Sequence, residues 1–205
     1  MARKHTGYVF ILSAPSGAGK TSLAQALVEA VDDLAISVSH TTRPQRPGEK
    51  QGVHYHFVTE PEFQAMIKAG DFLEYAQVFG NYYGTLRGAV DHLLQQGRNV
   101  VFDIDWQGAR AIKQKIPEAT SIFILPPSRE VLRERLVERG QDRDAIIHKR
   151  MGDAVSEMKH YGEFDYVVVN DEFDAALRDL RAIVQGRPES RRPLSIDIQA
   201  LLHGH

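Results

Sequence analysis

Short apolar runs and amphipathic segments alternate along most of the chain. Continuous apolar runs occupy residues 8–12, 100–102, 122–125 and 166–169. Runs of this length are typical of strands that are buried on both faces. Helical patterns separate them; after the first run, for example, Leu23, Leu27 and Val31 recur at helical spacing. Four buried strands interleaved with helices predict an α/β fold whose core is a parallel β-sheet flanked by helices.

The stretch from about residue 39 to residue 84 breaks this rhythm with shorter elements and more turn residues. We therefore expect an insertion with its own small sheet. The elements predicted around and within it are a short strand over 34–39, a loop over 41–52, an antiparallel-type strand over 53–58, a helix capped by Thr59 and ended by Gly70, a strand over 72–79, a turn at Gly80 and Asn81, and a helix over 86–96.

Two further segments stand apart from the alternating pattern. Residues 128–161 contain two arginine-rich helical patterns between strands that a single helix would normally join. An extra helical segment of this kind is typical of a lid over a binding site. The tail over 187–205 holds two prolines and then several apolar residues, and either packing on the body or packing at a subunit interface would account for it.

Composition narrows the class of protein. The chain has 205 residues, 42% hydrophobic and 25% charged, which is enough for one compact globular domain. A formal net charge of −2 gives no reason to expect nucleic-acid binding. There is no cysteine, so disulfides and thiolate chemistry are excluded. With no membrane-length apolar stretch and no signal-peptide pattern, we expect no membrane association and a cytoplasmic location.

A glycine-rich loop between the first strand and the first helix has the composition of a phosphate-binding loop. Residues 14–21 read Ala-Pro-Ser-Gly-Ala-Gly-Lys-Thr. Glycines let successive backbone N–H groups point inward toward an anion, and the positive end of the helix lies there as well. Lys20 would bind the β- and γ-phosphates, and the Thr21 hydroxyl would ligate Mg²⁺. The pattern favours glycine where this chain has Ala14, so we expect that position 14 needs no left-handed backbone.

Other polar residues stand where they could serve such a site. Asp103 ends a buried strand, where an acidic side chain would face the phosphate loop. Such a carboxylate could bind Mg²⁺ either directly or through a water molecule. Asp105 could act in the site or cap the next helix. The remaining candidates have ordinary alternatives in solvated loops, the core or salt-bridged surface helices. They are Arg43 and Arg46 as a phosphate clamp in the loop that follows Ser39, Tyr55 and Tyr83 as hydroxyl donors to the same phosphate, and Arg135, Arg139 and Arg150 for charge on a transferring phosphoryl group.

Several separate motifs resemble those of guanylate kinases. They lie, in chain order, at 16–21, 39–49, 74–77, 80–85, 103–108 and 169–171, and the resemblance runs from about residue 7 to residue 186. It implies transfer of the γ-phosphoryl group of ATP, with Mg²⁺ as cofactor, to GMP and also dGMP, in purine nucleotide metabolism and GMP recycling. It also implies a P-loop core over 1–38, 86–127 and 162–186, a GMP-binding insertion over 39–85, a lid over 128–161 and a tail over 187–205.

The resemblance also assigns roles to residues. The catalytic residues would be Lys20, Arg43, Arg135, Arg139 and Arg150. ATP would bind Ala14, Pro15, Ser16, Gly17, Ala18, Gly19, Lys20, Thr21, Ser22 and Asn170. GMP would bind Ser39, Arg43, Arg46, Tyr55, Glu74, Tyr83, Thr85, Asp103 and Asp105, and Thr21 and Asp103 would hold Mg²⁺, in part through water.

The chemistry of guanine agrees with Glu74 as its reader. Guanine presents its N1–H and its exocyclic amine side by side, and one carboxylate can accept from both. Two other functions are weighed against this one. A non-catalytic module that binds phosphorylated protein segments would not need Lys20 and Thr21. A kinase that acts on a ribosyl phosphate would leave Glu74 and Thr85 without a base to read.

Overall fold

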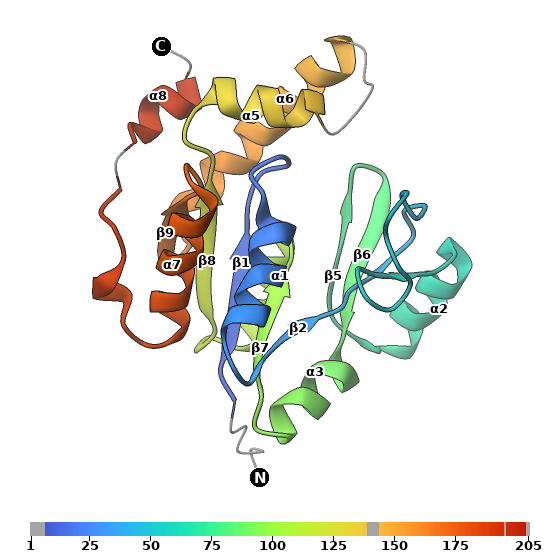
Figure 1. Ribbon diagram of the computed structural model, residues 1–205. Coiled ribbons are helices and arrows are strands. Elements are labelled where there is room, and N and C mark those ends of the chain that lie inside the picture. Colours follow the sequence, from blue (N-terminus) through green and yellow to red (C-terminus); the bar gives the residue numbers. More distant parts are fainter. Residues whose placement is uncertain (1–6, 139–143, 195, 204–205) are drawn as a thin grey trace. The chain divides into compact units, whose positions relative to one another are not determined.

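The structure is a computed structural model, and it describes residues 7–138, 144–194 and 196–203 (Figure 1). Five strands form one sheet in the order β2 (Leu34–Ser37), β7 (Asn99–Asp103), β1 (Val9–Ser13), β8 (Thr120–Leu125) and β9 (Tyr166–Val169). The pairs β2–β7 and β8–β9 are parallel, with Leu34 opposite Asn99 and Ile122 opposite Tyr166. The expected α/β fold with a parallel sheet core flanked by helices is confirmed.

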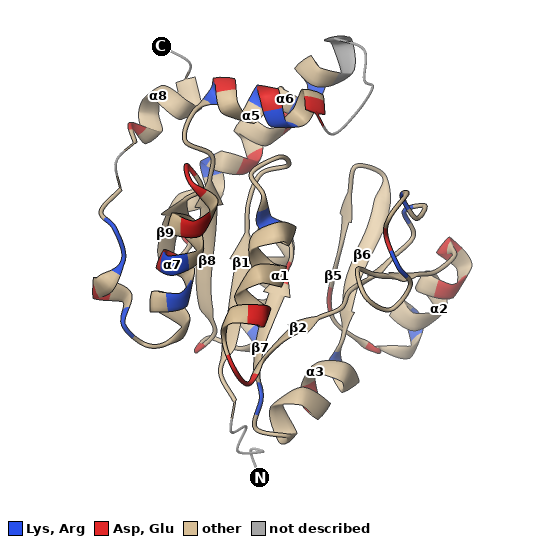
Figure 2. Ribbon diagram, in the orientation of Figure 1, with Lys and Arg blue, Asp and Glu red and all other residues tan. Residues whose placement is uncertain are grey.

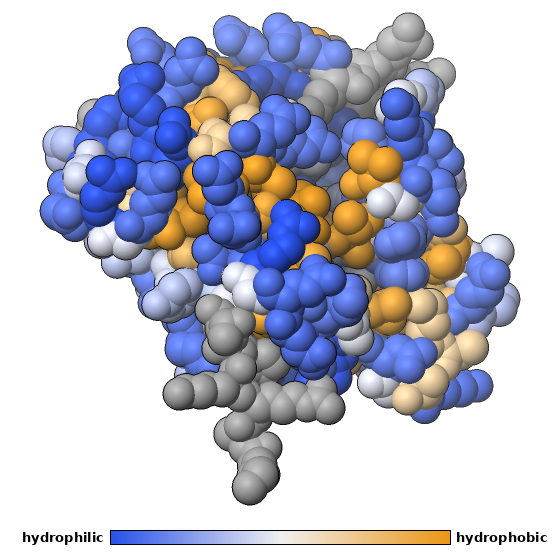
Figure 3. All heavy atoms as spheres, turned by 60° about the horizontal axis from the view of Figure 1, so that its bottom comes forward, coloured by the Kyte–Doolittle hydropathy of each residue, from blue (hydrophilic) through white to orange (hydrophobic). Residues whose placement is uncertain are grey.

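The continuous apolar runs form the most deeply buried strands. Every residue of β1 is buried, and Ile122, Phe123, Ile124 and Leu125 of β8 are fully inaccessible to solvent. A strand that is buried on both faces has apolar side chains on both, which is why these runs do not alternate between apolar and polar residues. Hydrophilic residues cover most of the face drawn in Figure 3, where apolar residues reach the surface in smaller groups.

The described chain divides into two compact units. One comprises residues 7–10, 33–102 and 107–119 and contains a second sheet, in the order β4 (His56–Phe57), β3 (His40–Thr41), β6 (Asn81–Leu86) and β5 (Phe72–Val78). This unit contains the helices α2 (Glu60–Ala69) and α3 (Arg87–Gln95). It also contains α4 (Trp106–Lys115) except for the first residue of that helix, Trp106. The small sheet predicted for the insertion is therefore present.

Local capping chemistry fixes the start of α2 as predicted. The Thr59 side chain accepts from the backbone N–H of Glu62, and the Glu62 carboxylate accepts from the backbone N–H of Thr59 at 2.7 Å. This reciprocal capping box satisfies two backbone donors that the helix itself cannot pair. The hairpin turn between β5 and β6 lies one residue earlier than predicted, at Phe79 and Gly80, where φ is 50° and 80°.

The prediction of an antiparallel-type strand over 53–58 is wrong. Only His56–Phe57 are a strand, and they pair in parallel with β3. The backbone N–H groups of Val53 and His54 both donate to the carbonyl of Lys50, so a tight turn uses the donors that a longer strand would need. Alternation of apolar and polar residues does not distinguish such a turn from a strand.

The second unit comprises residues 11–32, 103–106 and 120–203. Its helices α1 and α7 pack against each other, and α5 packs against α6. Two helices thus lie within the 128–161 segment, as predicted. The helices of this unit are α1 (Lys20–Ala30), α5 (Arg129–Glu138), α6 (Asp144–Met158), α7 (Phe173–Val184) and α8 (Ile198–His203), with short 3₁₀ turns at Lys159–Glu163 and Pro188–Ser190.

The C-terminal tail packs on the body of this unit. Leu201 of α8 is 4% exposed and belongs to the same apolar cluster as Leu125, Leu132 and Leu136. Ile196, Ile198 and Leu202 pack against that cluster from the same segment. Of the two alternatives left open by the sequence, the structure shows packing on the body.

Candidate active site

The phosphate-loop sequence forms the sharp connection between β1 and α1. Gly17 and Gly19 have φ of 91° and 89°, a left-handed conformation that favours glycine. The backbone N–H of Ala18 donates to the carbonyl of Pro15 at 3.1 Å, which closes the turn. Ala14 is buried, and among the described residues the non-glycine positions with positive φ are Asp33 and Phe79 alone. Alanine at position 14 therefore brings no backbone strain, as expected.

Side chains from other elements lie close to the two glycines of the phosphate loop. A Cβ atom on Gly17 would lie 3.0 Å from Leu132 and Leu136, and one on Gly19 would lie 2.5 Å from the amide nitrogen of Asn170. The backbone conformation favours glycine at both positions, and a Cβ at Gly19 would in addition displace the Asn170 amide. The loop is held between α5 and the residue that follows β9.

Lys20 begins α1 and forms an ion pair with Asp103 at the end of β7. The Lys20 and Asp103 side chains are only 19% and 9% exposed, so little solvent screens the pair. Thr21 and Ser22 follow in the first turn of the helix, Thr21 half-buried and Ser22 exposed. The structure thus brings the predicted acid to the lysine of the phosphate loop.

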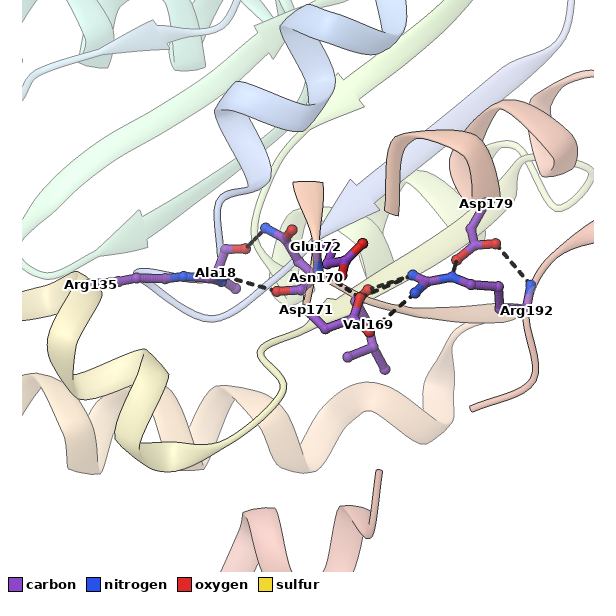
Figure 4. Close-up of polar contacts among 8 residues, drawn as sticks. All are labelled: Ala18, Arg135, Val169, Asn170, Asp171, Glu172, Asp179 and Arg192. Atoms are coloured by element: carbon purple, nitrogen blue, oxygen red, sulfur yellow. Dashed lines mark hydrogen bonds and ion pairs between the residues drawn. The ribbon is translucent and has the colours of Figure 1, made fainter. Parts of the chain in front are cut away.

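Asn170 and Arg135 lie against the same loop (Figure 4). The side-chain amide of Asn170 donates to the carbonyl of Ala18 at 2.8 Å, and Arg135 Nη2 donates to the carbonyl of Asn170 at 3.0 Å. Asn170 Oδ1 and Arg135 Nη1 are both buried and have no hydrogen-bond partner among the described residues. Buried polar atoms are almost always paired, so this acceptor and this donor beside the phosphate loop are candidates for contact with a ligand.

The other two predicted arginines of this segment are Arg150 and Arg139. Arg150 is half-buried on α6, and Arg139 lies outside the described residues. Acidic residues interleave with the arginines along α5, as Figure 2 shows. Arg135 is linked to the phosphate loop through Asn170, which accepts from it and donates to Ala18.

Glu157 of α6 is a loop contact that the sequence did not reveal. Its Oε2 accepts from the backbone N–H of Ser16 at 3.0 Å. Burial raises the pKa of Glu157; the Ser16 hydrogen bond opposes this, the negative charge of Asp105 adds to it, and the net pKa lies above its ordinary value. A single glutamate among the charged residues of a helix gives no sequence signal of such a contact.

In the first unit, a buried polar group joins three of the predicted GMP residues. Glu74 and Thr85 are opposite each other on β5 and β6, and the Thr85 hydroxyl donates to Glu74 Oε1 at 2.7 Å. The Ser39 hydroxyl lies 3.2 Å from that of Thr85. Glu74, Thr85 and Ser39 are 4%, 0% and 5% exposed. A carboxylate buried this deeply is oriented by its hydroxyl partner.

A second cluster in this unit centres on Arg43. Arg43 Nη2 donates to Glu49 Oε1 at 2.7 Å, and the guanidinium lies 5.4 Å from the centre of the Tyr55 ring. Tyr83 meets Tyr55 edge-on at 5.9 Å. Burial alone would lower the pKa of Arg43, but hydrogen bonding to Glu49 and the charges of Glu49 and Tyr83 raise it overall. The predicted Arg43, Tyr55 and Tyr83 are therefore together.

Arg46 is placed differently from Arg43. It is exposed in the loop, and its backbone N–H donates to Glu49 Oε2 at 2.7 Å. Glu49 therefore binds the side chain of one predicted phosphate-clamp arginine and the backbone of the other. An acidic residue three positions after Arg46 in the same loop was the available sequence signal for this role.

A parallel sheet with a phosphate-binding loop before its first helix defines the class: a nucleotide-binding α/β protein of the P-loop type. The family model for guanylate kinase matches residues 6–187. A guanylate kinase of Alkalilimnicola ehrlichii is 57% identical over 92% of this chain and 94% of its own. One of Vibrio cholerae is 59% identical over 87% of each chain. The chain belongs to the guanylate kinase family.

A solved structure supports the same assignment. The guanylate kinase from Anaplasma phagocytophilum superposes with a TM-score of 0.75 at 33% identity, covering 89% of this chain and 86% of its own. No helix in the described part of the chain is long and apolar enough to cross a membrane.

Proposed function

We propose that the protein transfers the γ-phosphoryl group of ATP to GMP, giving ADP and GDP, and that dGMP also serves as acceptor. The observation that carries this proposal is the intact phosphate loop, with Lys20 paired to Asp103, in a chain of the guanylate kinase family. A non-catalytic module of the kind weighed above would not need that lysine. The cytoplasmic location stays a prediction from the sequence.

ATP would bind with its phosphates on the loop. The positive end of α1, Lys20 and the loop N–H groups other than those of Ser16 and Ala18 would supply the positive potential. The unpaired Nη1 of Arg135 is a donor for a phosphate oxygen, and the unpaired Oδ1 of Asn170 is an acceptor for a ligand N–H. Fixed donors of this kind stabilise charge that develops on the transferring group.

Mg²⁺ fits the oxygen donors at this site. The Thr21 hydroxyl and the Asp103 carboxylate are hard ligands, and Asp103 already lies at the lysine of the loop. The described residues contain no group of three or more histidine or acidic side chains that could hold a metal ion, so nucleotide oxygens and water would complete the shell. When bound, Mg²⁺ would neutralise charge on the β- and γ-phosphates.

GMP would bind in the first unit. Glu74 would accept from the N1–H and the exocyclic amine of guanine, and its bond from Thr85 fixes the carboxylate for that task. Arg43, Tyr55 and Tyr83 would hold the phosphate, with Ser39 and Arg46 nearby in sequence. Arg43 is paired with Glu49 in the structure, so the acceptor phosphate would share or replace that partner.

One assay separates this function from its alternatives. ADP release would be measured with Mg²⁺ and ATP, and with GMP, AMP or a ribosyl phosphate as acceptor. We expect turnover with GMP and little with the other two. Turnover with the sugar phosphate instead would favour the second kinase function, and no ATP binding by calorimetry would favour the non-catalytic module.

Glu74→Gln is the sharpest test of the acceptor site. The amide keeps the shape but offers guanine one acceptor instead of two, so the KM for GMP should rise by about 10- to 100-fold. The KM for ATP should stay within about twofold, because the Glu74 carboxylate is bonded to Thr85 of the first unit, whereas the phosphate loop belongs to the second unit. Steady-state kinetics with each substrate varied in turn checks this, and an unchanged kcat/KM for GMP would remove Glu74 from the site.

A further inference from the structure

One side chain of the C-terminal segment, Arg192, binds the turn that follows β9 (Figure 4). Its Nη1 and Nη2 donate to the two carboxylate oxygens of Asp171, each at 3.1 Å. Its Nε and its own backbone N–H donate to the two carboxylate oxygens of Asp179 on α7, both at 2.8 Å. Nη2 also lies 3.4 Å from the carbonyl of Val169. Arg192 thereby joins the turn to α7.

The electrostatics of this cluster favour a fixed geometry. Burial by itself raises the pKa of Asp171, but hydrogen bonds from Arg192 and from the backbone of Glu172 outweigh it and hold the pKa below its ordinary value. Asp179 is 6% exposed. A two-pronged contact between a guanidinium and a charged carboxylate restricts both orientation and distance, which a single hydrogen bond does not.

The residue next to Asp171 is the one that contacts the phosphate loop. Asn170 is 4% exposed, its backbone N–H donates to the carbonyl of Leu125 at 2.8 Å, and its side chain donates to Ala18. Its amide nitrogen lies 2.5 Å from the position that a Cβ on Gly19 would occupy. A shift of the turn at Asp171 would therefore move the side chain that lies against the loop.

We propose that Arg192 is a positioning residue for the triphosphate site. It holds the segment over 169–171 so that Asn170 stays against Ala18 and Gly19, with Asn170 Oδ1 unpaired among the described residues. The inference rests on the proposed function, in which this loop binds ATP. Its expected signature is a change in the affinity for ATP and none in that for GMP.

The test compares Arg192→Gln with Arg191→Gln. Arg191 is the matched control, because it donates to Val167 and lies over the Tyr166 ring, two strand residues that precede the turn. Binding of a non-hydrolysable ATP analogue is measured by calorimetry, and the KM for GMP is measured at saturating ATP. We expect Arg192→Gln to weaken analogue binding about fivefold or more. Its KM for GMP, and both quantities in Arg191→Gln, should stay within about twofold.

Two further variants separate positioning from general stability. Arg192→Lys keeps the positive charge but loses the planar guanidinium that makes two parallel hydrogen bonds. It should therefore recover part of the affinity for the analogue. In an Asn170→Ala background, Arg192→Gln should have little additional effect, because the path through Asn170 is already broken. Thermal unfolding of each variant confirms that binding is measured on folded protein, and Arg192→Lys provides the measurement if Arg192→Gln does not fold.

The outcomes distinguish this inference from the proposed function. If Lys20→Met leaves binding of the analogue intact, the loop is not the ATP site and the proposed function fails. If Lys20→Met abolishes binding while Arg192→Gln behaves as Arg191→Gln does, only the inference fails. Equal effects of Arg192→Gln on ATP and GMP, or full additivity with Asn170→Ala, would also overturn it.

Discussion

At the scale of single residues, the phosphate loop shows which glycines of its sequence pattern are required. Gly17 and Gly19 have positive φ, and a Cβ would lie 3.0 Å from leucine methyl groups at Gly17 and 2.5 Å from the Asn170 amide at Gly19. Position 14 does not have a positive φ, so alanine occupies it without backbone strain. The loop therefore accommodates alanine at position 14, whereas the backbone conformation favours glycine at positions 17 and 19.

This difference predicts opposite outcomes for two substitutions. Gly19→Ala would force a Cβ to 2.5 Å from the Asn170 amide and would strain the backbone by about 1–3 kcal/mol, so we expect weaker ATP binding and a lower Tm. Ala14→Gly should cost only about 0.4–1 kcal/mol through chain entropy and leave ATP binding nearly unchanged. Calorimetry and thermal unfolding of the pair check this; equal ATP affinity in both variants would contradict it.

At the scale of elements, what could be predicted depends on the distance between partners along the chain. Buried strands such as β8 leave a continuous apolar record, and the phosphate loop is a local strand, turn and helix, so both were predictable. The capping box of α2 is local as well, since Thr59 and Glu62 are three residues apart. These features each depend on residues that are neighbours in sequence.

The contacts that join distant segments could not be predicted in this way. Ser16 and Glu157 are 141 residues apart, and the Asn170 contact to Ala18 spans 152 residues. Glu157 and Arg192 look in the sequence like any charged surface residue. Their roles follow only from which backbone groups the fold brings to them. The motif resemblance pointed to Asn170 but gave no sign of these partners.

The contact between α6 and the phosphate loop predicts a pH-dependent stability. The pKa of Glu157 in the folded protein is raised above 4.5, so its ionisation favours the unfolded state. The free energy of unfolding therefore falls as pH rises above about 4.5. Glu157→Gln keeps an acceptor for the Ser16 N–H and removes the charge. We therefore expect Glu157→Gln to gain stability relative to the unsubstituted protein as pH rises from about 4 to 8.

Denaturant unfolding of both proteins at matched pH values measures this gain. The exposed Glu134 of α5 provides the control, since Glu134→Gln removes the same charge without a loop contact. A difference between Glu157→Gln and the unsubstituted protein that is constant across the pH range would show that burial of this charge is not the cause.

At the scale of the whole chain, the C-terminal helix α8 packs on residues that contact the phosphate loop. Gly17 of the phosphate loop lies against Leu132 and Leu136. These two residues belong to the apolar cluster that Leu201 of α8 completes, 184 positions after Gly17 in the printed numbering. The C-terminal helix is thus part of the packing behind the loop.

Leu201→Ala tests this support. Removing a buried leucine leaves a cavity and should cost about 2–5 kcal/mol, which corresponds to a fall in Tm of about 2–4 °C for each kcal/mol. His203→Ala, an exposed position of the same helix, should leave Tm nearly unchanged. Below the unfolding transition, both variants should keep kcat, because α8 supports the core and supplies no group to the proposed site. A Leu201→Ala protein as stable as His203→Ala would show that the cluster is complete without the C-terminal helix.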